Sequence, residues 1–378
     1  MKIVKNHIHI LLYAFIFVSF LYPLPADAQV ISKAPEDLFI VGSESINFPS
    51  EITNSDYKLY INLPESYDTN AKKTYPVYYA LDASRTFALT TRIYKGLWND
   101  GLAPEIIIVG IDYNGSKTNP NLHRSRDLTP THIERIPTSG GASKFLKVLS
   151  DEIIPFIDNH YRSDKSNRTL AGTSFAGLFT HYTLFTQPTL FNNYIINNLT
   201  FWWDNGYAYQ LEEKFYQKKT TLNARVLFLS GEFDALKETT QMVEQIKGRN
   251  SYNLDLDFRM VENMMHLGGE AEAINQGMRF AYKRSNIKIP EEELKQYCGT
   301  YQDGDYVREV VIRDGELSLK PLQESSGVKI HAINKNEFAL LGRYFNFHFN
   351  KNEKGEVISF SSQRDTDPSR TTTAVKIN

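Results

Sequence analysis

The segment Thr169–Leu178 has the residue types and the spacing of a serine nucleophile. Its sequence is Thr-Leu-Ala-Gly-Thr-Ser-Phe-Ala-Gly-Leu. Apolar residues up to Ala171 predict a strand, and the apolar residues after Phe175 predict a helix, so Ser174 falls on the turn between them. This context is typical of the G-x-S-x-G elbow, in which a sharp strand-to-helix turn exposes the serine hydroxyl.

The elbow departs from that pattern at one position. Gly172 occupies the first glycine position, but Ala176 replaces the second glycine and Gly177 follows it. Small residues here permit close approach of helix and strand, so we expect alanine to be tolerated. The alternative interpretation is a serine that caps an ordinary helix.

A serine nucleophile needs a general base, and chain order selects His266. In hydrolases with this elbow the acid and then the histidine follow the serine. His266 lies between a predicted strand, Leu254–Met260, and a final predicted helix, about Glu270 to Tyr282. The other histidines precede the serine, share its helix or fall outside the catalytic region: His7, His9, His123, His132, His160, His181, His331 and His348. A packing role beside the preceding methionines remains the alternative for His266.

The acid is expected on a loop between these two residues. Val226–Leu229 predicts a buried strand, and Gly231, Glu232 and Asp234 follow it. The spacing after the glycine favours Asp234, which would orient the His266 ring and stabilise its protonated form. Glu232 is the fallback, and either carboxylate could instead cap the next helix.

An oxyanion hole needs two backbone N–H groups directed at the developing negative charge. Phe175, directly after the nucleophile, supplies one. The second is expected after the strand Tyr75–Leu81, and Ala83 is the candidate by position.

The elements around these residues alternate between strands and helices from Tyr57 to about residue 285, which predicts an α/β fold with a mostly parallel sheet. Several strands are apolar without alternation, as in Val77–Leu81 and Ile106–Val109, so both of their faces should be covered. After Pro290 only alternating segments and turn signals remain, which predicts a small all-β sandwich or barrel. The expected domains are residues 29–288 and 289–378.

Residues 1–28 have the pattern of a signal peptide. Lys2 and Lys5 precede the apolar run Ile8–Leu21, and Ala26-Asp27-Ala28 forms an A-x-A cleavage site. We therefore expect a mature chain beginning near Gln29, exported to the periplasm or the extracellular space. The alternative is an uncleaved N-terminal anchor.

Composition excludes several classes of protein. The 378 residues are 41% hydrophobic and 13% aromatic with a net charge of -2, which excludes an intrinsically disordered chain and gives no reason to expect nucleic acid as a partner. A single cysteine, Cys298, excludes a disulfide scaffold. No later segment predicts stable membrane insertion, no phosphate-binding loop or metal-ligand spacing is present, and we expect no cofactor. The expected partner is a small-molecule ester.

Several longer phrases resemble a secreted esterase family of α/β-hydrolases that includes siderophore trilactone, feruloyl and acetyl esterases. Tyr75–Asp82 is similar to the family's Y-P-V-x-Y-x-L-D-G, and Arg124–Thr131 to its R-x-R-D-x-T-P-T. Gly141–Tyr161 resembles the helix before the elbow, and Phe201–Asp204 the end of S-P-S-L-W-W-D. The C-terminal region, from Tyr297, more weakly resembles a β module appended to secreted serine hydrolases.

The resemblance implies Ser174 as nucleophile, His266 as base and Asp234 or Glu232 as acid. It also implies a substrate pocket with the side chains Trp202, Trp203, Arg124 and Arg126, whose alternative roles are core packing and an ion pair with Asp127. The chain departs from the family at Ala83, at Ala176 and at Asn197–Thr200, where S-P-S is usual.

We therefore predict a secreted serine carboxylic ester hydrolase that forms an acyl-enzyme with a small or siderophore- or phenolic-type ester. A serine amidase or peptidase of the same fold is the nearest alternative. The departures from the family motifs favour a second alternative, which is a non-catalytic or weakly active binding protein on a hydrolase scaffold.

Overall fold

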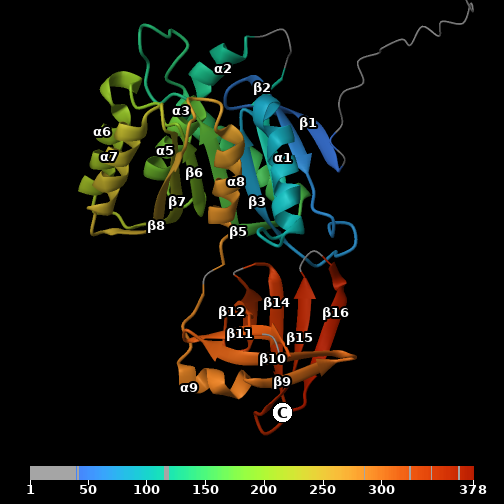
Figure 1. Ribbon diagram of the computed structural model, residues 1–378. Helices are drawn as coiled ribbons and strands as arrows, with labels where there is room; N and C mark the ends of the chain where they lie inside the picture. Colours follow the sequence, from blue (N-terminus) through green and yellow to red (C-terminus); the bar gives the residue numbers. More distant parts are fainter. Residues whose placement is uncertain are drawn as a thin grey trace, which may run out of the picture. The chain divides into compact units, whose positions relative to one another are not determined.

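A computed structural model describes residues 40, 42–114, 119–284, 286–322, 325–341, 343–364 and 367–378. The predicted signal peptide lies outside the described residues. Two architectures follow each other along the described chain, an α/β region and a closed β-barrel (Figure 1). The predicted combination of a mostly parallel α/β domain and a small all-β domain is confirmed, and the second region is a barrel and not a sandwich.

The α/β region is built on an eight-stranded sheet with the order β1-β2-β4-β3-β5-β6-β7-β8. β1 and β2 pair antiparallel with each other, β2 pairs antiparallel with β4, and the remaining neighbours are parallel. The strands are β1 (Ser43–Ser50), β2 (Ser55–Asn62), β3 (Tyr75–Leu81), β4 (Ile107–Tyr113), β5 (Ser163–Thr173), β6 (Asn193–Asn197), β7 (Leu222–Gly231) and β8 (Tyr252–Val261).

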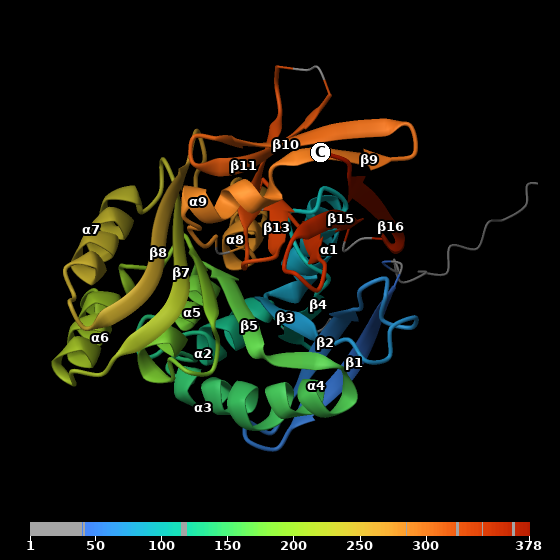
Figure 2. The same ribbon diagram turned by 90° about the horizontal axis from the view of Figure 1, so that it is seen from below.

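Helices cover both faces of this sheet, as the apolar strands predict. On one face lie α1 (Ala83–Asn99) and α8 (Glu270–Ala281), and the opposite face carries α5 (Phe175–Thr186) (Figures 1 and 2). Strand β3 shows the consequence, since Tyr79 packs into the core on the α5 side and Tyr78 into the core on the α1 side. The other helical elements are α2 (Pro120–Asp127), α3 (Ala142–Lys147), η1 (Val148–Ile153), α4 (Ile154–His160), η2 (Trp203–Asn205), α6 (Tyr207–Gln217) and α7 (Leu236–Lys247).

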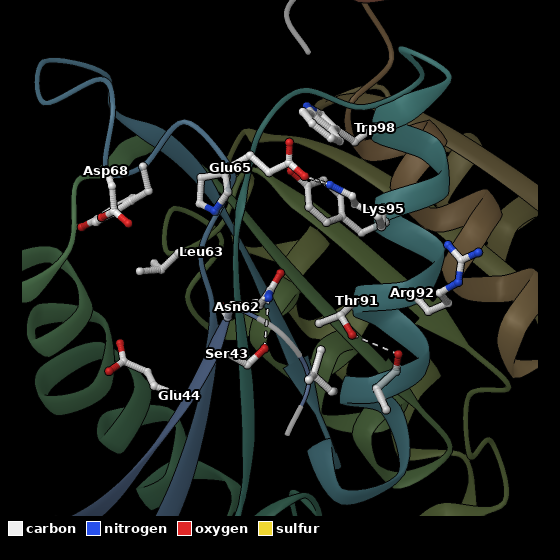
Figure 3. Close-up of a pocket in the computed structure, with 16 residues that line it drawn as sticks. Ser43, Glu44, Asn62, Leu63, Glu65, Asp68, Thr91, Arg92, Lys95 and Trp98 are labelled. Carbon is white, nitrogen blue, oxygen red and sulfur yellow. Dashed lines mark hydrogen bonds and ion pairs between the residues drawn. The ribbon is translucent and has the colours of Figure 1, made fainter. Parts of the chain in front are cut away.

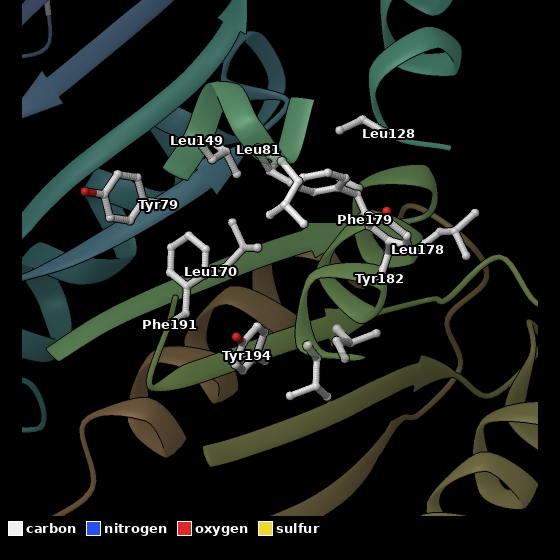
Figure 4. Packing of buried hydrophobic residues seen from close by; sticks show 14 of the residues in the cluster. Tyr79, Leu81, Leu128, Leu149, Leu170, Leu178, Phe179, Tyr182, Phe191 and Tyr194 are labelled. Carbon is white, nitrogen blue, oxygen red and sulfur yellow. The ribbon is translucent and has the colours of Figure 1, made fainter. Parts of the chain in front are cut away.

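The core on the α5 side holds the elbow in place. Leu170 of β5, Phe179 of α5 and Tyr194 of β6 are fully buried together (Figure 4). Burying such side chains is worth roughly 1.5–3 kcal/mol each relative to exposure. The turn between β5 and α5 is therefore fixed by packing on both sides of it.

The parallel strands β3 to β8 all end at one edge of the sheet. The loops that follow β3, β5, β6, β7 and β8 therefore meet there, which is where open α/β sheets bind their ligands. Every residue of the predicted catalytic set follows one of these strands directly or within its loop.

The C-terminal region is a closed barrel of eight antiparallel strands in the order β10-β11-β12-β13-β14-β15-β16-β9. Its core combines aliphatic side chains with aromatic ones, among them Tyr301, Phe338 and Phe360. The elements are α9 (Glu291–Leu294), η3 (Lys295–Tyr297), β9 (Gly299–Asp303), β10 (Tyr306–Arg313), β11 (Glu316–Pro321), β12 (Val328–Ala332), β13 (Glu337–Leu340), β14 (Phe345–Lys351), β15 (Val357–Arg364) and β16 (Asp367–Lys376). Within the part of the chain that the structure describes, no helix has the length and apolarity to cross a membrane.

Candidate active site

Ser174 occupies a strained turn between β5 and α5. Its backbone has φ 64° and ψ -120°, a combination that a residue with a side chain adopts only when its surroundings impose it. The Ser174 N–H donates to the carbonyl of Asn197 at the end of β6, at 3.0 Å. The side chain is half-buried, and its hydroxyl forms no hydrogen bond within the described residues. This is the geometry of a nucleophile elbow.

The small residues around Ser174 are required by close backbone contacts. A Cβ on Gly172 would overlap the carbonyl of Ala176, and a Cβ on Gly177 would lie 2.7 Å from the carbonyl oxygen of Asn197. Ala176 itself is fully buried. The steric demand for glycine therefore falls on positions 172 and 177, and the departure at Ala176 fits the elbow.

His266 and Asp234 lie on adjacent loops and contact each other. The Nδ1 atom of His266 is 2.8 Å from Oδ2 of Asp234, and the two side chains are 46% and 23% exposed. Asp234 follows β7, whereas His266 lies between β8 and α8. Glu232, the alternative acid, instead accepts a hydrogen bond from the N–H of Asn263 at 2.9 Å.

The structure thus brings together His266 and the favoured acid. The described contacts include no hydrogen bond between Ser174 and His266. Catalytic hydrogen bonds are often long or poorly aligned before a substrate binds, so this geometry is compatible with a triad.

Ala83 is the first residue of α1, and Phe175 is the first residue of α5. First-turn N–H groups have no partner inside their helix, and the helix dipole makes this end attractive to an anion. Neither N–H donates to an acceptor in the described part of the chain. The N–H of Ser84, one residue further on, is occupied by the carboxylate of Asp112.

Arg124 supports the loop that carries Ala83. Its guanidinium binds both carboxylate oxygens of Asp82, at 2.7 and 2.9 Å, and lies 5.6 Å from the ring centre of Phe175. Burial opposes the charge on Arg124, but the hydrogen bonds and the attraction to Asp82 outweigh it and raise the pKa of Arg124. Asp82 has φ 57°, so this ion pair holds a left-handed turn beside the helix start.

Arg126 has a different role from Arg124. It binds Asp127 through two hydrogen bonds, at 2.7 and 2.8 Å, and also donates to Ser55. The hydroxyl of Tyr57 donates to the same Asp127 carboxylate at 2.9 Å. This network ties α2 to β2, and the structure gives Arg126 no contact with Ser174 or His266.

The two neighbouring tryptophans also differ. Trp203 is fully buried, and its Nε1 donates to the hydroxyl of Thr131 at 3.0 Å. Trp202 is 54% exposed, and the guanidinium of Arg135 lies 4.3 Å from its ring centre. Trp203 therefore packs in the core, whereas Trp202 is available to a ligand.

A cavity of about 410 Å³ opens beside the His266–Asp234 pair. It is lined by Asn198, Leu199, Thr200, Phe201, Trp202, Tyr209, Asp234, Ala235, Glu238 and His266. Tyr209 and Glu238 were not predicted from the sequence, because they belong to α6 and α7 and only the packing of these helices brings them here. Arg135, on a long loop, carried no motif that would have identified it.

A larger cavity, of about 860 Å³, lies elsewhere, between α1 and the strands β1 and β2 (Figure 3). Its wall includes Lys95, which forms an ion pair with Glu65 and lies 4.1 Å from the ring centre of Trp98. No residue predicted for catalysis or substrate binding lines it. We therefore place the candidate active site at the smaller cavity.

Two further observations concern groups outside this site. His181 is buried on α5, and neither ring nitrogen has a hydrogen-bond partner within the described part of the chain; burial lowers its pKa to about 3. Among the described residues, no cluster of three or more histidine, cysteine, aspartate or glutamate side chains is arranged to hold a metal ion.

The doubly covered parallel sheet and its serine elbow define an α/β-hydrolase fold. A family model described as "Putative esterase" matches residues 50–264, which is more than half of the chain. The protein belongs to this esterase family. The predicted class, a carboxylic ester hydrolase, is thereby confirmed at the level of the family.

Individual relatives agree with this assignment. The ferri-bacillibactin esterase BesA of Bacillus subtilis (strain 168) is 25% identical over 266 residues, covering 64% of this chain and 90% of its own. The siderophore enterobactin esterase of Emericella nidulans is 28% identical over 171 residues, covering 39% of this chain and 55% of its own. The crystal structure of the BES protein from Bacillus cereus superposes with a TM-score of 0.59 at 24% identity, covering 64% of this chain and 95% of that one, which shows a common fold.

Proposed function

We propose that this protein is an exported serine carboxylesterase in which Ser174 is the nucleophile, His266 the general base and Asp234 the acid. The observation that carries the proposal is the 2.8 Å contact between His266 Nδ1 and Asp234 Oδ2, at the sheet edge where Ser174 occupies its strained elbow. A carboxylate on Nδ1 leaves Nε2 free to accept a proton from the serine hydroxyl.

In the proposed reaction, the Ser174 oxygen attacks the ester carbonyl while His266 takes the hydroxyl proton. The N–H groups of Ala83 and Phe175 stabilise the negative oxygen of the tetrahedral intermediate. His266 then donates its proton to the departing alcohol, which leaves an ester between Ser174 and the acyl group. Water, activated by His266, hydrolyses this acyl-enzyme and restores the serine.

The substrate that we propose is a small ester of the siderophore or phenolic type. The names of two relatives support it, since one is a ferri-bacillibactin esterase and the other an enterobactin esterase. The cavity beside His266 supports an aromatic group, because Trp202 lines it with an exposed ring and Arg135 lies over that ring. An aromatic ring can stack on tryptophan, and an arginine can bind its oxygen substituents.

A fluorophosphonate probe tests the nucleophile. We expect it to label the wild-type protein and to fail with Ser174→Ala, whereas Ser84→Ala should be labelled like the wild type. Ser84 is an exposed serine beside the proposed oxyanion loop and is therefore a matched control. Absence of labelling in a well-folded wild-type protein would refute the proposed mechanism.

A panel of acetyl, butyryl, feruloyl and siderophore esters, together with the matching amides, tests the substrate. Hydrolysis of the esters alone supports an esterase over an amidase or peptidase. The proposed export is tested by N-terminal sequencing of protein recovered from outside the cytoplasm. A start near Gln29 supports cleavage of the signal peptide, and an intact Met1 on membrane-bound protein would contradict it.

A further inference from the structure

Asn198 lies at the junction of all three loops that carry the proposed triad. It directly follows β6 and is 2% exposed. Its Nδ2 donates to the carbonyl oxygen of His266 at 2.6 Å, and its Oδ1 accepts from the N–H of Gly231 at 2.9 Å. The side chain therefore joins the last residue of β7, whose following loop carries the acid, to the loop after β8, which carries the base.

The backbone next to this side chain reaches the third loop. The carbonyl of Asn197 accepts the N–H of Ser174 at 3.0 Å, and the N–H of Asn198 donates to the carbonyl of Leu229 at 2.9 Å. Asn197 and Asn198 are thus hydrogen-bonded to the elbow, to the last residues of β7, and to His266 itself.

The two side-chain hydrogen bonds fix the orientation of the Asn198 amide. One partner is a carbonyl oxygen and the other an N–H, so the amide must present its nitrogen to the first and its oxygen to the second. Aspartate offers only acceptors when ionised. The backbone φ of 46° at this position also favours asparagine, which tolerates the left-handed region better than most residues with a side chain.

We propose that Asn198 is a positioning residue that sets the distance of His266 from Ser174. This inference rests on the proposed function and deepens it, because it explains what replaces the family's S-P-S at the segment where this chain departs from it. A partly buried hydrogen bond of 2.6 Å to the main chain of His266 restrains the loop at the base itself. Among the described residues, the His266 ring itself is hydrogen-bonded to Asp234 alone, and the loop that carries Asp234 begins after Gly231, which donates to the same Asn198 amide.

The loops around Asn198 are in close contact, so a shift in one is passed to the others. The N–H of Phe233, next to Asp234, donates to the carbonyl of Met264 at 3.0 Å. A Cβ on Gly231 would lie 2.6 Å from that same carbonyl oxygen. The acid loop and the histidine loop therefore contact each other directly through their main chains.

The test is Asn198→Gly, which removes the amide and keeps the left-handed backbone accessible. The matched control is Asn193→Gly at the other end of β6. Asn193 is 4% exposed and its amide also makes two side-chain hydrogen bonds, to Asn167 and Thr169. Both variants lose a buried asparagine at an end of β6, but only Asn198 touches the proposed triad loops.

We expect Asn198→Gly to lower kcat by about 10- to 100-fold with KM changed less than about 3-fold, since a misplacement on the order of 1 Å costs that much in rate. Asn198→Asp, which keeps an acceptor for Gly231 but loses the donor to His266, should also lower kcat with little change in KM. Asn193→Gly should keep kcat within about 2-fold of the wild type, although its melting temperature falls similarly.

Equal values of kcat for the two glycine variants, or an effect of Asn198→Gly on KM alone, would overturn the assignment of Asn198. The fluorophosphonate probe separates this result from a failure of the proposed function. A wild-type protein that is neither labelled nor active refutes the esterase mechanism, and with it the inference. A labelled, active wild type whose Asn198→Gly variant is equally active refutes only the positioning role.

Discussion

The α/β region and the barrel each contain a histidine paired with a carboxylate at the same distance. In the α/β region, His266 Nδ1 lies 2.8 Å from Asp234, and in the barrel His331 Nδ1 lies 2.8 Å from Glu316. The first pair spans two loops beside a strained serine. The second spans the neighbouring strands β11 and β12, and Lys329 lies 3.5 Å from the same glutamate.

A histidine–carboxylate pair can act in catalysis only where its surroundings admit a substrate. His266 is 46% exposed and lines a cavity of about 410 Å³, so a substrate can reach it. Glu316 already has a lysine partner, and within the described residues neither His331 nor Glu316 contacts a serine hydroxyl. We therefore interpret the barrel pair as a surface ion pair.

Removing the acid of each pair should have the largest difference in effect on catalysis. We expect Asp234→Asn to lower kcat by about 10³- to 10⁴-fold, because the histidine is then held in the wrong tautomer. Glu316→Gln should leave kcat unchanged. Initial rates on an ester from the panel measure both. If Glu232→Gln abolishes turnover and Asp234→Asn does not, the acid is assigned to the wrong residue.

His181 is a third case, a buried histidine whose ring nitrogens have no hydrogen-bond partner among the described residues. Burial lowers its pKa from 6.5 to about 3, so the unfolded chain gains a proton at this residue below about pH 6.5 while the folded protein does not. The free energy of unfolding should therefore fall as the pH drops from 6.5 towards 3.

His181→Leu should remove this dependence, whereas the exposed His132→Leu should retain it. Between pH 7 and pH 4 the free energy of unfolding of the wild type should fall by about 3 kcal/mol more than that of His181→Leu, as measured by urea unfolding. Parallel pH curves for the two proteins would show that His181 titrates normally in the folded state.

How much of the site the sequence predicts depends on the range of the contacts involved. Ser174 could be predicted because strand, turn and helix are encoded within ten residues. His266 and Asp234 could be located by chain order and by spacing after a buried strand. The hydrogen bonds of Asn198 could not be predicted, because its partners Gly231 and His266 are distant in the chain and only sheet pairing brings them together.

In the fold, too, only the elements with a clear local sequence pattern could be predicted. The apolar strands of the α/β region and the alternation of the barrel were predictable, since each leaves a periodic pattern. β1 was missed, because Ser43–Ser50 forms a largely exposed edge strand with a weak pattern. β5 begins at Ser163 and not at Thr169, because residues 163–168 are polar and give no apolar strand pattern, although Ser163 already pairs with Tyr75 of β3.

Gly231→Ala tests whether the loops that carry Asp234 and His266 are as tightly coupled as their contacts indicate. A Cβ would lie 2.6 and 2.7 Å from the carbonyl oxygens of Met264 and Met265, so the histidine loop must move. We expect kcat/KM to fall about 10- to 100-fold. The free energy of unfolding should fall by about 1–3 kcal/mol. Gly96→Ala, where no atom lies within 4 Å, is the control and should be as active as the wild type.

Trp202 is an exposed aromatic residue beside the His266–Asp234 pair, and the barrel also has an exposed aromatic residue. Trp202→Ala should raise KM for an aromatic ester about 10-fold with kcat nearly unchanged, because the lost contact binds the substrate in its ground state as well as in its transition state. Tyr306, which is 72% exposed on β10, is the matched aromatic residue. Tyr306→Ala should leave both constants unchanged, and a similar rise in KM would instead implicate the barrel in substrate binding.

The smallest expected effect is the contribution of the barrel pair to folding. Burial opposes ionisation of Glu316, but the hydrogen bond from His331 and the charge of Lys329 outweigh it and lower the pKa of Glu316. A lowered carboxylate pKa stabilises the folded state above the unfolded pKa, and this contribution disappears as the pH falls through the folded one. Because Glu316 is 39% exposed, solvent screens the pair, and Glu316→Gln should lower the free energy of unfolding at pH 7 by less than about 1 kcal/mol. A loss of several kcal/mol in urea unfolding would show that the pair supports the barrel and is not a surface ion pair.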